Sequence, residues 1–409
     1  MAQIKFVKIM CVKFLFAALF GMLNSGAAIA QPVGTFSQFL QEFESKARQN
    51  GISSATYRQA MEGVEYDASI ARRISGQPEF TTPIWEYIER RVSAGRISRG
   101  KSAMERNWTL FEAVGRHYGV DPFVLGAIWG IETDYGAVLS NTNLIKPILP
   151  SLAALVYQRR GRVALDEAEL ISALKLVQSG HSPGTLVGSW AGAMGHLQVN
   201  SSILLSKGTD GNGDGKVDVH NSLADALATS AVLLNSFGYK SGVDWGFEVT
   251  LPAGFDYSLA SRNQMKPIGF FVDRGVARVA GRVFGDLDQE VFLYLPAGKD
   301  GPKFLMTPNY LVLKSYNFSD SYALAVAHLT DRLKGAGGFV SSWPTQTKFP
   351  NRAQRIAIQN RLAQLGFYQG EVDGRIGPIT QEAYQRYQLE NGLLADGFIT
   401  LETFYQLGG

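Results

Sequence analysis

One stretch predicts a buried helix more clearly than any other, Asp121-Pro-Phe-Val-Leu-Gly-Ala-Ile-Trp-Gly-Ile-Glu-Thr-Asp-Tyr-Gly136. Asp121 is a favourable N-cap residue, and Pro122 suits the first helical position because its missing N–H is not needed there. The apolar side chains fall on one helical face, and they are Phe123, Val124, Ala127, Ile128 and Ile131. We therefore expect a helix from Asp121 to Thr133 that buries this face and ends before Gly136.

Glu132 is the residue of this helix that is a candidate for a catalytic role. It follows Ile128 by four positions, so it flanks the apolar face instead of the solvated one. A carboxyl group beside Trp129 and Ile131 loses hydration, which raises its pKa and lets it act as a general acid near neutral pH. The residues alone leave a second interpretation open, a boundary glutamate that pairs with an arginine or caps a turn.

The start of the chain predicts export. Lys5, Lys8 and Lys13 precede the apolar run 14–23, and Ala28-Ile29-Ala30 is an A-x-A cleavage signature. A membrane-spanning helix needs about 20 apolar residues, so this run is too short for a permanent anchor. We expect residues 1–30 to be a signal peptide that is removed before Gln31, which predicts a periplasmic location and no membrane span in the mature chain.

Removal of the signal peptide changes the charge and the cysteine count. The whole chain has 39 basic and 36 acidic residues, and three lysines leave with the signal peptide, so the mature chain is balanced at 36 against 36. The charge therefore gives no reason to expect a nucleic-acid or lipid-surface partner. The single cysteine, Cys11, also leaves, so the mature protein forms no disulfide and depends on its core for stability.

Composition and periodicity predict a mainly α protein of the α+β type. Hydrophobic residues make up 45% of the 409, which excludes wholesale disorder. Helical spacing dominates from Thr35 to about Asp244, strand-like runs and turns occupy about 245–313, and helix returns over 319–333. Residues 334–350 are rich in Gly and Ser and predict a linker. The last segment, 351–409, predicts a small three-helix module with helices at 353–365, 380–391 and 400–407.

Three blocks resemble family B lytic murein transglycosylases. The first surrounds Glu132, the second is Gly188-Ser-Trp-Ala-Gly-Ala-Met-Gly-His-Leu-Gln198, and the third is Leu313-Lys-Ser-Tyr-Asn-Phe-Ser-Asp-Ser-Tyr-Ala-Leu-Ala325. They occur in the family's order with similar spacing, and the likeness extends from about Val33 to Leu333. The resemblance implies a catalytic region at 31–333 with a lysozyme-like α domain. It also implies cleavage of peptidoglycan glycan strands between N-acetylmuramic acid (MurNAc) and N-acetylglucosamine (GlcNAc).

The resemblance also implies roles for single residues. Glu132 would protonate the bridging oxygen and then deprotonate the muramyl 6-hydroxyl, which gives a 1,6-anhydro product with help from the substrate's N-acetyl group. Ser189, Gln198, Tyr316 and Asn317 would line the sugar site, with Asn317 orienting the acetamido group. Alternatives are a helix cap for Ser189, a surface amide for Gln198 and a core aromatic for Tyr316. Residues 196–200, His-Leu-Gln-Val-Asn, depart from the commoner x-P-Q-F-M, which puts the local backbone in doubt.

A loop rich in aspartate and glycine fits the first half of an EF-hand. Asp210, Asn212 and Asp214 take positions 1, 3 and 5, Gly215 takes position 6, and Lys216 can offer its carbonyl at position 7. Position 12 is Asn221 instead of glutamate, and the family resemblance adds Asp225 as a later ligand. We expect a weak, structural calcium ion and no cofactor for catalysis. The alternative is a solvated turn.

The C-terminal module resembles the three-helix peptidoglycan-binding domain. The motifs that carry this likeness are Leu365-Gly-Phe-Tyr-Gln-Gly370, Val372-Asp-Gly374, Ile376-Gly377 and Gly392-Leu393. Such a module would raise the local substrate concentration by tethering the enzyme to the wall. The alternative is a generic helical accessory domain. Cell-wall synthesis or division proteins are possible partners, and the sequence does not identify one.

Two other functions compete with transglycosylation. A hydrolytic muramidase would pair Glu132 with Asp134 or another carboxylate to activate water, but Asp134 is only two positions away and should point elsewhere on a helix. A non-catalytic peptidoglycan-binding protein would need no acid at all. The products of digestion and the behaviour of a Glu132→Gln variant distinguish these alternatives.

Overall fold

The computed structural model describes residues 34–73, 82–159 and 163–409. The predicted signal peptide, residues 1–30, lies outside the described residues. None of the helices within these ranges combines the length and the apolar character that a membrane crossing requires. The described chain is mainly helical, with a small antiparallel sheet and a C-terminal helical module, so the predicted fold class is confirmed.

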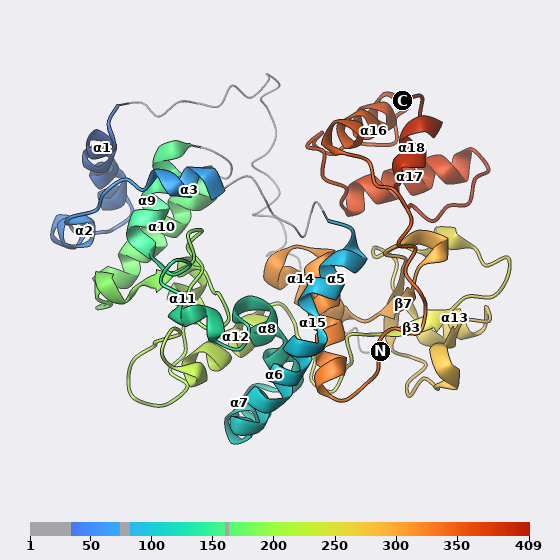
Figure 1. Ribbon diagram of the computed structural model, residues 1–409, viewed down its shortest axis with the longest axis horizontal. Helices are drawn as coiled ribbons and strands as arrows, with labels where there is room; N and C mark the ends of the chain where they lie inside the picture. Colours follow the sequence, from blue (N-terminus) through green and yellow to red (C-terminus); the bar gives the residue numbers. More distant parts are fainter. Residues whose placement is uncertain (1–33, 74–81, 160–162) are drawn as a thin grey trace, which may run out of the picture.

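Helix α8 (Pro122–Thr133) forms where the sequence predicts a helix, within the predicted catalytic region. The Asp121 side chain accepts the N–H of Phe123 at 2.8 Å, and Pro122 occupies the first turn. Gly126 allows close packing, because a Cβ atom there would lie 2.4 Å from the sulfur of Met104. The helix packs against α15 (Asp320–Leu333) (Figure 1). Most residues of α15 are also buried.

The other helices of the catalytic region surround this pair. One group lies on the side of the N-terminal helices in Figure 1 and consists of α1 (Phe36–Gln49), α2 (Ser54–Met61), α3 (Ala68–Arg73), α9 (Ile148–Gln158), α10 (Val163–Gln178) and α11 (Ser201–Lys207). The second group packs near α8 and α15 and consists of α5 (Ile84–Arg91), α6 (Ala94–Arg106), α7 (Trp108–Tyr118), α12 (Leu223–Ser236) and α14 (Pro308–Asn317). Together they share one large hydrophobic core with α8 and α15.

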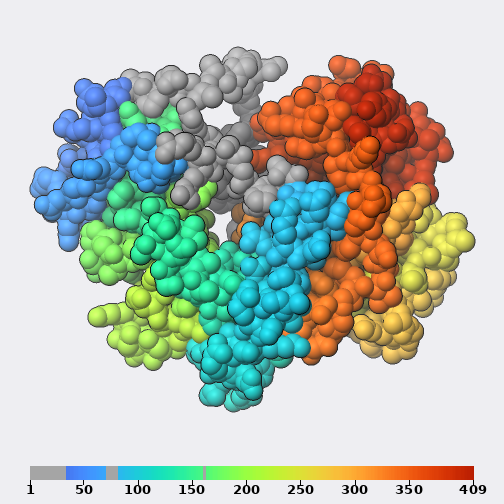
Figure 2. Space-filling model, viewed as in Figure 1, coloured from blue at the N-terminus to red at the C-terminus, as the bar shows by residue number. Residues whose placement is uncertain are grey.

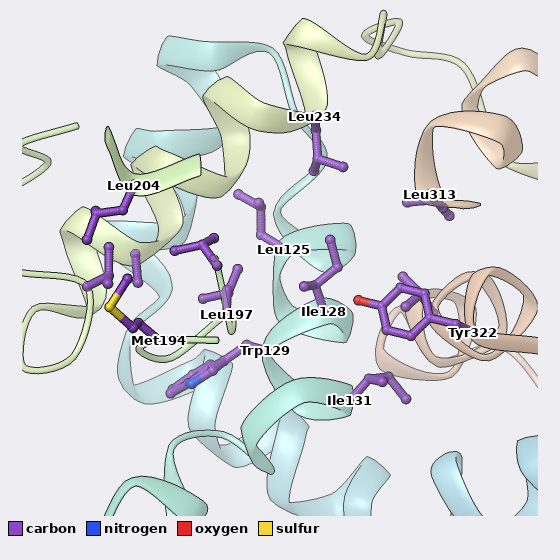
Figure 3. Close-up of a cluster of buried hydrophobic side chains, with 14 of the residues drawn as sticks. Leu125, Ile128, Trp129, Ile131, Met194, Leu197, Leu204, Leu234, Leu313 and Tyr322 are labelled. Carbon is purple, nitrogen blue, oxygen red and sulfur yellow. The ribbon is translucent and has the colours of Figure 1, made fainter. Parts of the chain in front are cut away.

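A short two-stranded sheet begins the loop that faces α8. Strands β1 (Lys146–Pro147) and β2 (Val187–Gly188) pair antiparallel, and isolated bridges join Gly188 to Met194 and Met194 to Val199. The loop 188–200 is therefore folded back on itself instead of extended. Its apolar residues Met194 and Leu197 lie on the same side of α8 as Trp129, whereas Tyr322 approaches from the other side (Figure 3).

The strand-rich subdomain contains a five-stranded antiparallel sheet with its own core. The strand order is β4-β6-β7-β3-β5, and the bounds are β3 (Gly246–Thr250), β4 (Lys266–Pro267), β5 (Ala277–Arg278), β6 (Glu290–Tyr294) and β7 (Lys303–Met306), with the short helix α13 (Ile268–Val272) packed on β4. The expected strand-rich range, 245–313, extends too far, since α14 begins at Pro308. Thr307 caps that helix by accepting the N–H of Asn309.

Residues 334–350 form no helix or strand, but they pack along the catalytic region. Glu248 accepts the backbone N–H groups of Val340 and Ser341 at 2.8 and 2.7 Å. The ring of Phe339 stacks on His328 at 4.0 Å, and Trp343 lies against Trp85. The predicted linker is therefore a packed strap in this structure, visible as the orange chain between the catalytic region and the module in Figure 2.

The C-terminal module contains the three predicted helices, α16 (Arg352–Gln364), α17 (Pro378–Glu390) and α18 (Leu401–Gln406), around a separate apolar core. It contacts the strand-rich subdomain directly. The Gln385 amide donates to the carbonyl oxygens of Tyr257 and Ala260 at 3.1 Å each, and Asn263 donates to Glu382 at 3.0 Å. These contacts fix the module at one side of the catalytic region.

Candidate active site

Glu132 lies in the last turn of α8 and faces α15. The hydroxyl of Tyr322 donates a hydrogen bond to Glu132 Oε1 at 2.7 Å. Tyr322 is 1% exposed, whereas Glu132 is half-buried. Burial and the nearby Glu132 charge raise the pKa of Tyr322 well above its ordinary value, so the phenol stays protonated and acts as the donor. Figure 3 shows its oxygen directed at α8.

Tyr316 lies beside Tyr322, but its hydroxyl contacts the loop 188–200 instead of Glu132. The two rings are nearly parallel, with centroids 6.3 Å apart and planes at 8°. The Tyr316 hydroxyl donates to the carbonyl oxygen of Leu197 at 2.8 Å and lies 3.1 Å from the Ser230 hydroxyl. Burial and the Glu132 charge raise its pKa as well. Tyr316 thus connects α14 to the loop 188–200 immediately beside Glu132.

Asp134 points away from Glu132 into a pair of arginines. Its carboxylate lies 3.2 Å from Arg96 and 2.9 Å from Arg99, both on α6. The chain reverses here because Asp134, Tyr135 and Gly136 all adopt left-handed conformations with φ of 50°, 61° and 86°. Asp134 is therefore an ion-paired residue of the turn and does not form a carboxylate pair with Glu132.

The loop 188–200 is attached to the C-terminal end of α8. Thr133 is fully buried, and its hydroxyl donates to the carbonyl oxygen of His196 at 2.7 Å. The same Thr133 oxygen accepts the N–H of Gly136 at 3.2 Å, which joins the loop, the helix and the left-handed turn. The loop that contains the unusual residues 196–200 is thus attached to the end of α8, next to Glu132.

The predicted sugar-site residues differ in how their side chains are used. The Ser189 hydroxyl accepts the N–H of Ala193 at 3.1 Å and fixes the turn 189–193. Gln198 has φ of 51° and donates its amide to the carbonyl oxygen of Gly195 at 2.9 Å. Asn317 ends α14 and is half-buried, and within the described ranges its side chain makes no hydrogen bond. The structure thus brings Gln198, Tyr316 and Asn317 to the elements around Glu132, while Ser189 shapes the loop.

The aspartate-rich loop is a separate, compact turn. Asp210 accepts backbone N–H groups from Gly213, Asp214 and Gly215 at 2.6, 3.2 and 2.7 Å. These N–H groups, that of Gly215 most strongly, hold the pKa of the Asp210 carboxyl below its ordinary value. Asp214 accepts the N–H of Lys216 at 2.9 Å. Within the described residues, no three His, Cys, Asp or Glu side chains form a metal-binding group, so any ligand set must include amide or carbonyl oxygen.

Asp225, the last predicted ligand, is only 1% exposed and lies on α12 behind this loop. One of its oxygens accepts the N–H of Gly211 at 3.0 Å, and the other accepts the N–H of Asp218 at 2.7 Å. Both carboxylate oxygens are therefore used to hold the two ends of the loop against α12. This position gives Asp225 a role in shaping the loop.

The sequence did not identify Tyr322, Thr133 or the arginines as parts of this site. Tyr322 belongs to the third of the three sequence blocks and follows Tyr316 by six positions. The two tyrosines lie on adjacent helices, so this spacing could have indicated that both contribute to the site. Arg96 and Arg99 carried no such signal, because their contact with Asp134 depends on how α6 crosses α8.

Residues 35–331 match the family of transglycosylase SLT domains, and residues 351–407 match the family of peptidoglycan binding domains. A structure of SltB3 from Pseudomonas aeruginosa in complex with NAG-anhNAM-pentapeptide is similar with a TM-score of 0.84 and 38% identity. That comparison covers 92% of this chain and 100% of SltB3. A structure of SltB1 from the same organism is similar over 74% of this chain and 98% of SltB1, with a TM-score of 0.61 and 25% identity.

Membrane-bound lytic murein transglycosylase B of Escherichia coli (strain K12) is 28% identical to the chain over 237 residues. The match covers 56% of this chain and 59% of that relative, so the chain spans less than two thirds of its length. The structure of Escherichia coli Slt35 in complex with calcium shares the fold, with a TM-score of 0.59 and 21% identity over 73% of this chain and 92% of Slt35.

Proposed function

The chain belongs to the transglycosylase SLT family, and we propose that it is a lytic transglycosylase of peptidoglycan. It cleaves the β-1,4 bond between MurNAc and GlcNAc and leaves 1,6-anhydro-MurNAc ends. One observation carries this proposal. Glu132 receives a hydrogen bond from the neutral Tyr322, whereas the adjacent carboxylate, Asp134, is bound by Arg96 and Arg99. One carboxyl group is thus presented to substrate, and a second one two positions away is diverted from it.

A single carboxyl group suffices for this reaction because it acts twice. Glu132 first donates its proton to the bridging oxygen, so the glycosidic C–O bond breaks and the GlcNAc hydroxyl leaves. The Glu132 carboxylate then takes the proton from the muramyl 6-hydroxyl, whose oxygen bonds to the anomeric carbon. Glu132 regains its proton and no water is consumed. Tyr322 supports both steps because it fixes one carboxyl oxygen in place and stays protonated itself.

The residues around Glu132 fit a sugar site. The Asn317 amide has no partner within the described residues, so it can bind the acetamido group that stabilises positive charge at the anomeric carbon. Gln198 lies on the loop that Tyr316 and Thr133 hold against α8 and α14. Ser189 contributes through the turn that it caps, since its hydroxyl accepts the N–H of Ala193.

The C-terminal module supports a wall substrate. A peptidoglycan binding domain beside a transglycosylase domain concentrates the enzyme on its insoluble polymer. Because the strap and Gln385 hold this module against the catalytic region, it presents the wall at a fixed position. The A-x-A signature at 28–30 supports export and action in the periplasm.

The aspartate-rich loop supports binding of a calcium-class cation with a structural role. Asp210, Asn212 and Asp214 offer side-chain oxygens and Lys216 offers its carbonyl, which is the donor type that calcium prefers. Asp225 holds the loop through two backbone N–H groups, and its oxygens keep lone pairs with which it would also bind the ion. Calcium at 1 mM should raise the melting temperature of the protein, and an Asp210→Asn, Asp214→Asn double variant should show no such rise. Equal rises in both proteins would remove this proposal.

Product analysis tests the proposed reaction. Purified sacculi are digested with the protein, and the released muropeptides are analysed by mass spectrometry with and without borohydride reduction. We expect anhydro ends, which are one water lighter than reducing ends and resist reduction. Reducing ends would instead support a hydrolytic muramidase. The absence of both, together with retained binding to sacculi, would support a non-catalytic wall-binding protein.

A further inference from the structure

His196 connects the loop 188–200 to α8 through its ring as well as its backbone. The indole Nε1–H of Trp129 donates to His196 Nδ1 at 3.0 Å. The two rings also meet edge to face, with centroids 5.7 Å apart and planes at 68°. On the backbone, His196 donates its N–H to the Val219 carbonyl oxygen at 2.9 Å and accepts the Thr133 hydroxyl at 2.7 Å.

The indole partner determines the state of the histidine ring. A tryptophan side chain can only donate, so His196 Nδ1 must carry a lone pair and the ring proton must lie on Nε2. Burial lowers the pKa of His196 to about 4, helped by the nearby His220. The ring is therefore neutral in the periplasmic pH range and keeps its acceptor.

The surroundings of His196 leave little room for another arrangement. A Cβ atom on Gly136 would lie 3.0 Å from His196 Cε1, so the ring packs directly against the left-handed turn that ends α8. On the other side, a Cβ atom on Gly195 would lie 2.1 Å from the Val219 oxygen, so the backbone before His196 is pressed against Val219. Both the ring and the main chain of His196 are thus held in place.

These contacts belong to a continuous chain of contacts that begins at Glu132, the proposed acid, and returns to its own helix α8. Glu132 is bonded by Tyr322, which stacks on Tyr316, and Tyr316 donates to the carbonyl oxygen of Leu197. Leu197 follows His196 directly, and His196 returns to α8 through Trp129 and Thr133. If the contact between Trp129 and His196 is lost, Gln198 can shift relative to Glu132, and a small misplacement of this kind lowers catalytic rates strongly.

We propose that His196 is a positioning residue whose ring acceptor, bound by Trp129, sets the distance between the sugar-binding loop and Glu132. This proposal rests on the proposed transglycosylase function. It predicts that the position of the loop, and therefore the activity, depends on a hydrogen-bond acceptor at the place of His196 Nδ1. Asparagine can place its Oδ1 at that position, whereas leucine has a similar size and no acceptor.

The test compares His196→Leu with His196→Asn, and His117→Leu is the matched control because that histidine is exposed on α7. The indole N–H signal of Trp129 is recorded by ¹H–¹⁵N spectroscopy and assigned among the six tryptophans with Trp129→Phe. The kcat and KM are measured on soluble peptidoglycan oligomers. We expect the Trp129 signal to move upfield and kcat/KM to fall about 10-fold in His196→Leu only, as for one lost hydrogen bond.

Rescue by asparagine separates positioning from general damage. We expect His196→Asn to keep the downfield Trp129 signal and a kcat/KM within about 3-fold of the parent. Equal losses in both His196 variants, or an unshifted Trp129 signal in His196→Leu, would overturn the proposal. If His196→Leu fails to fold, the Trp129 indole signal and the kcat/KM of His196→Asn decide whether the proposal holds. If the parent forms no anhydro product, the function fails, and the Trp129 signals alone decide the positioning role.

Discussion

Glu132 and Asp134 lie two positions apart at the end of the same helix, yet their surroundings are opposite. Glu132 faces α15, where the neutral phenol of Tyr322 donates a hydrogen bond to one carboxyl oxygen. Asp134 lies on the left-handed turn and faces α6, where two guanidinium groups neutralise it. The difference shows that the role of a carboxyl group here is set by the helix that packs against it. The phenol donates a hydrogen bond to Glu132, whereas the arginines form ion pairs with Asp134.

The largest expected effect is the difference in lytic activity between a Glu132 variant and an Asp134 variant. Glu132→Gln removes the proton donor and acceptor, so lysis of sacculi should fall about 1000-fold, as expected for the loss of general acid–base catalysis. Asp134→Asn should stay within about 3-fold of the parent, because Asp134 only forms ion pairs on the turn. Turbidity assays on both variants measure this. Comparable losses in the two variants would mean that the carboxylates act as a pair.

Asp331 at the end of α15 extends the comparison to a third carboxyl group. Burial raises its pKa to about 6, while Trp245 donates a hydrogen bond to it at 3.1 Å. A raised acid pKa means that the folded state favours the protonated form, so stability is gained as pH falls through about 6. Asp331→Asn should therefore raise the unfolding free energy by up to about 3 kcal/mol at pH 8. This advantage should vanish near pH 4 in urea titrations, and a pH-independent difference would contradict it.

The next effect concerns the neutral donor itself. Tyr322→Phe deletes the hydrogen bond to Glu132, so kcat should fall about 10-fold with KM nearly unchanged. Tyr316→Phe is the matched variant, since its hydroxyl holds Leu197 instead of Glu132, and it should mainly raise KM. Steady-state kinetics on soluble oligomers distinguish the two. If both variants show the same split between kcat and KM, the two tyrosines do not have separate roles.

The smallest expected effect is on the stability of the turn. Asp134→Asn keeps a residue that tolerates positive φ and removes only the charge. Arg99 is 53% exposed, so the ion pairs should contribute no more than about 1 kcal/mol and should weaken in salt. Urea unfolding at low and high salt measures this difference. A larger loss that persists at high salt would show that the turn depends on Asp134 for more than charge.

The sequence predicted local features well where one segment carried the signal. Asp121 and Pro122 marked the start of α8, and the three helices of the C-terminal module begin and end within two residues of their predicted bounds. The predicted strand-rich range ended at residue 313, although helix α14 already begins at Pro308. The β-rich run that precedes Thr307 made the helix-capping signal of Thr307-Pro308 hard to recognise.

Contacts between distant segments could not be predicted from the sequence. Tyr322 reaches Glu132 across 190 positions, and Arg96 reaches Asp134 across 38. Periodicity predicts which face of a helix is buried, but the partner on that face depends on how the helices cross. Glu132 was identified by its place beside an apolar face, whereas its donor and the arginines that divert Asp134 required the structure.

The central claim is that Glu132 acts without a water nucleophile, and isotope labelling tests it most directly. Sacculi are digested with the protein in H₂¹⁸O, and the new ends are analysed by mass spectrometry at early times. We predict that the muropeptides carry anhydro ends without ¹⁸O, because the muramyl 6-hydroxyl attacks the anomeric carbon. One ¹⁸O atom at each new end would contradict the account, since it would show that water is activated by a second group.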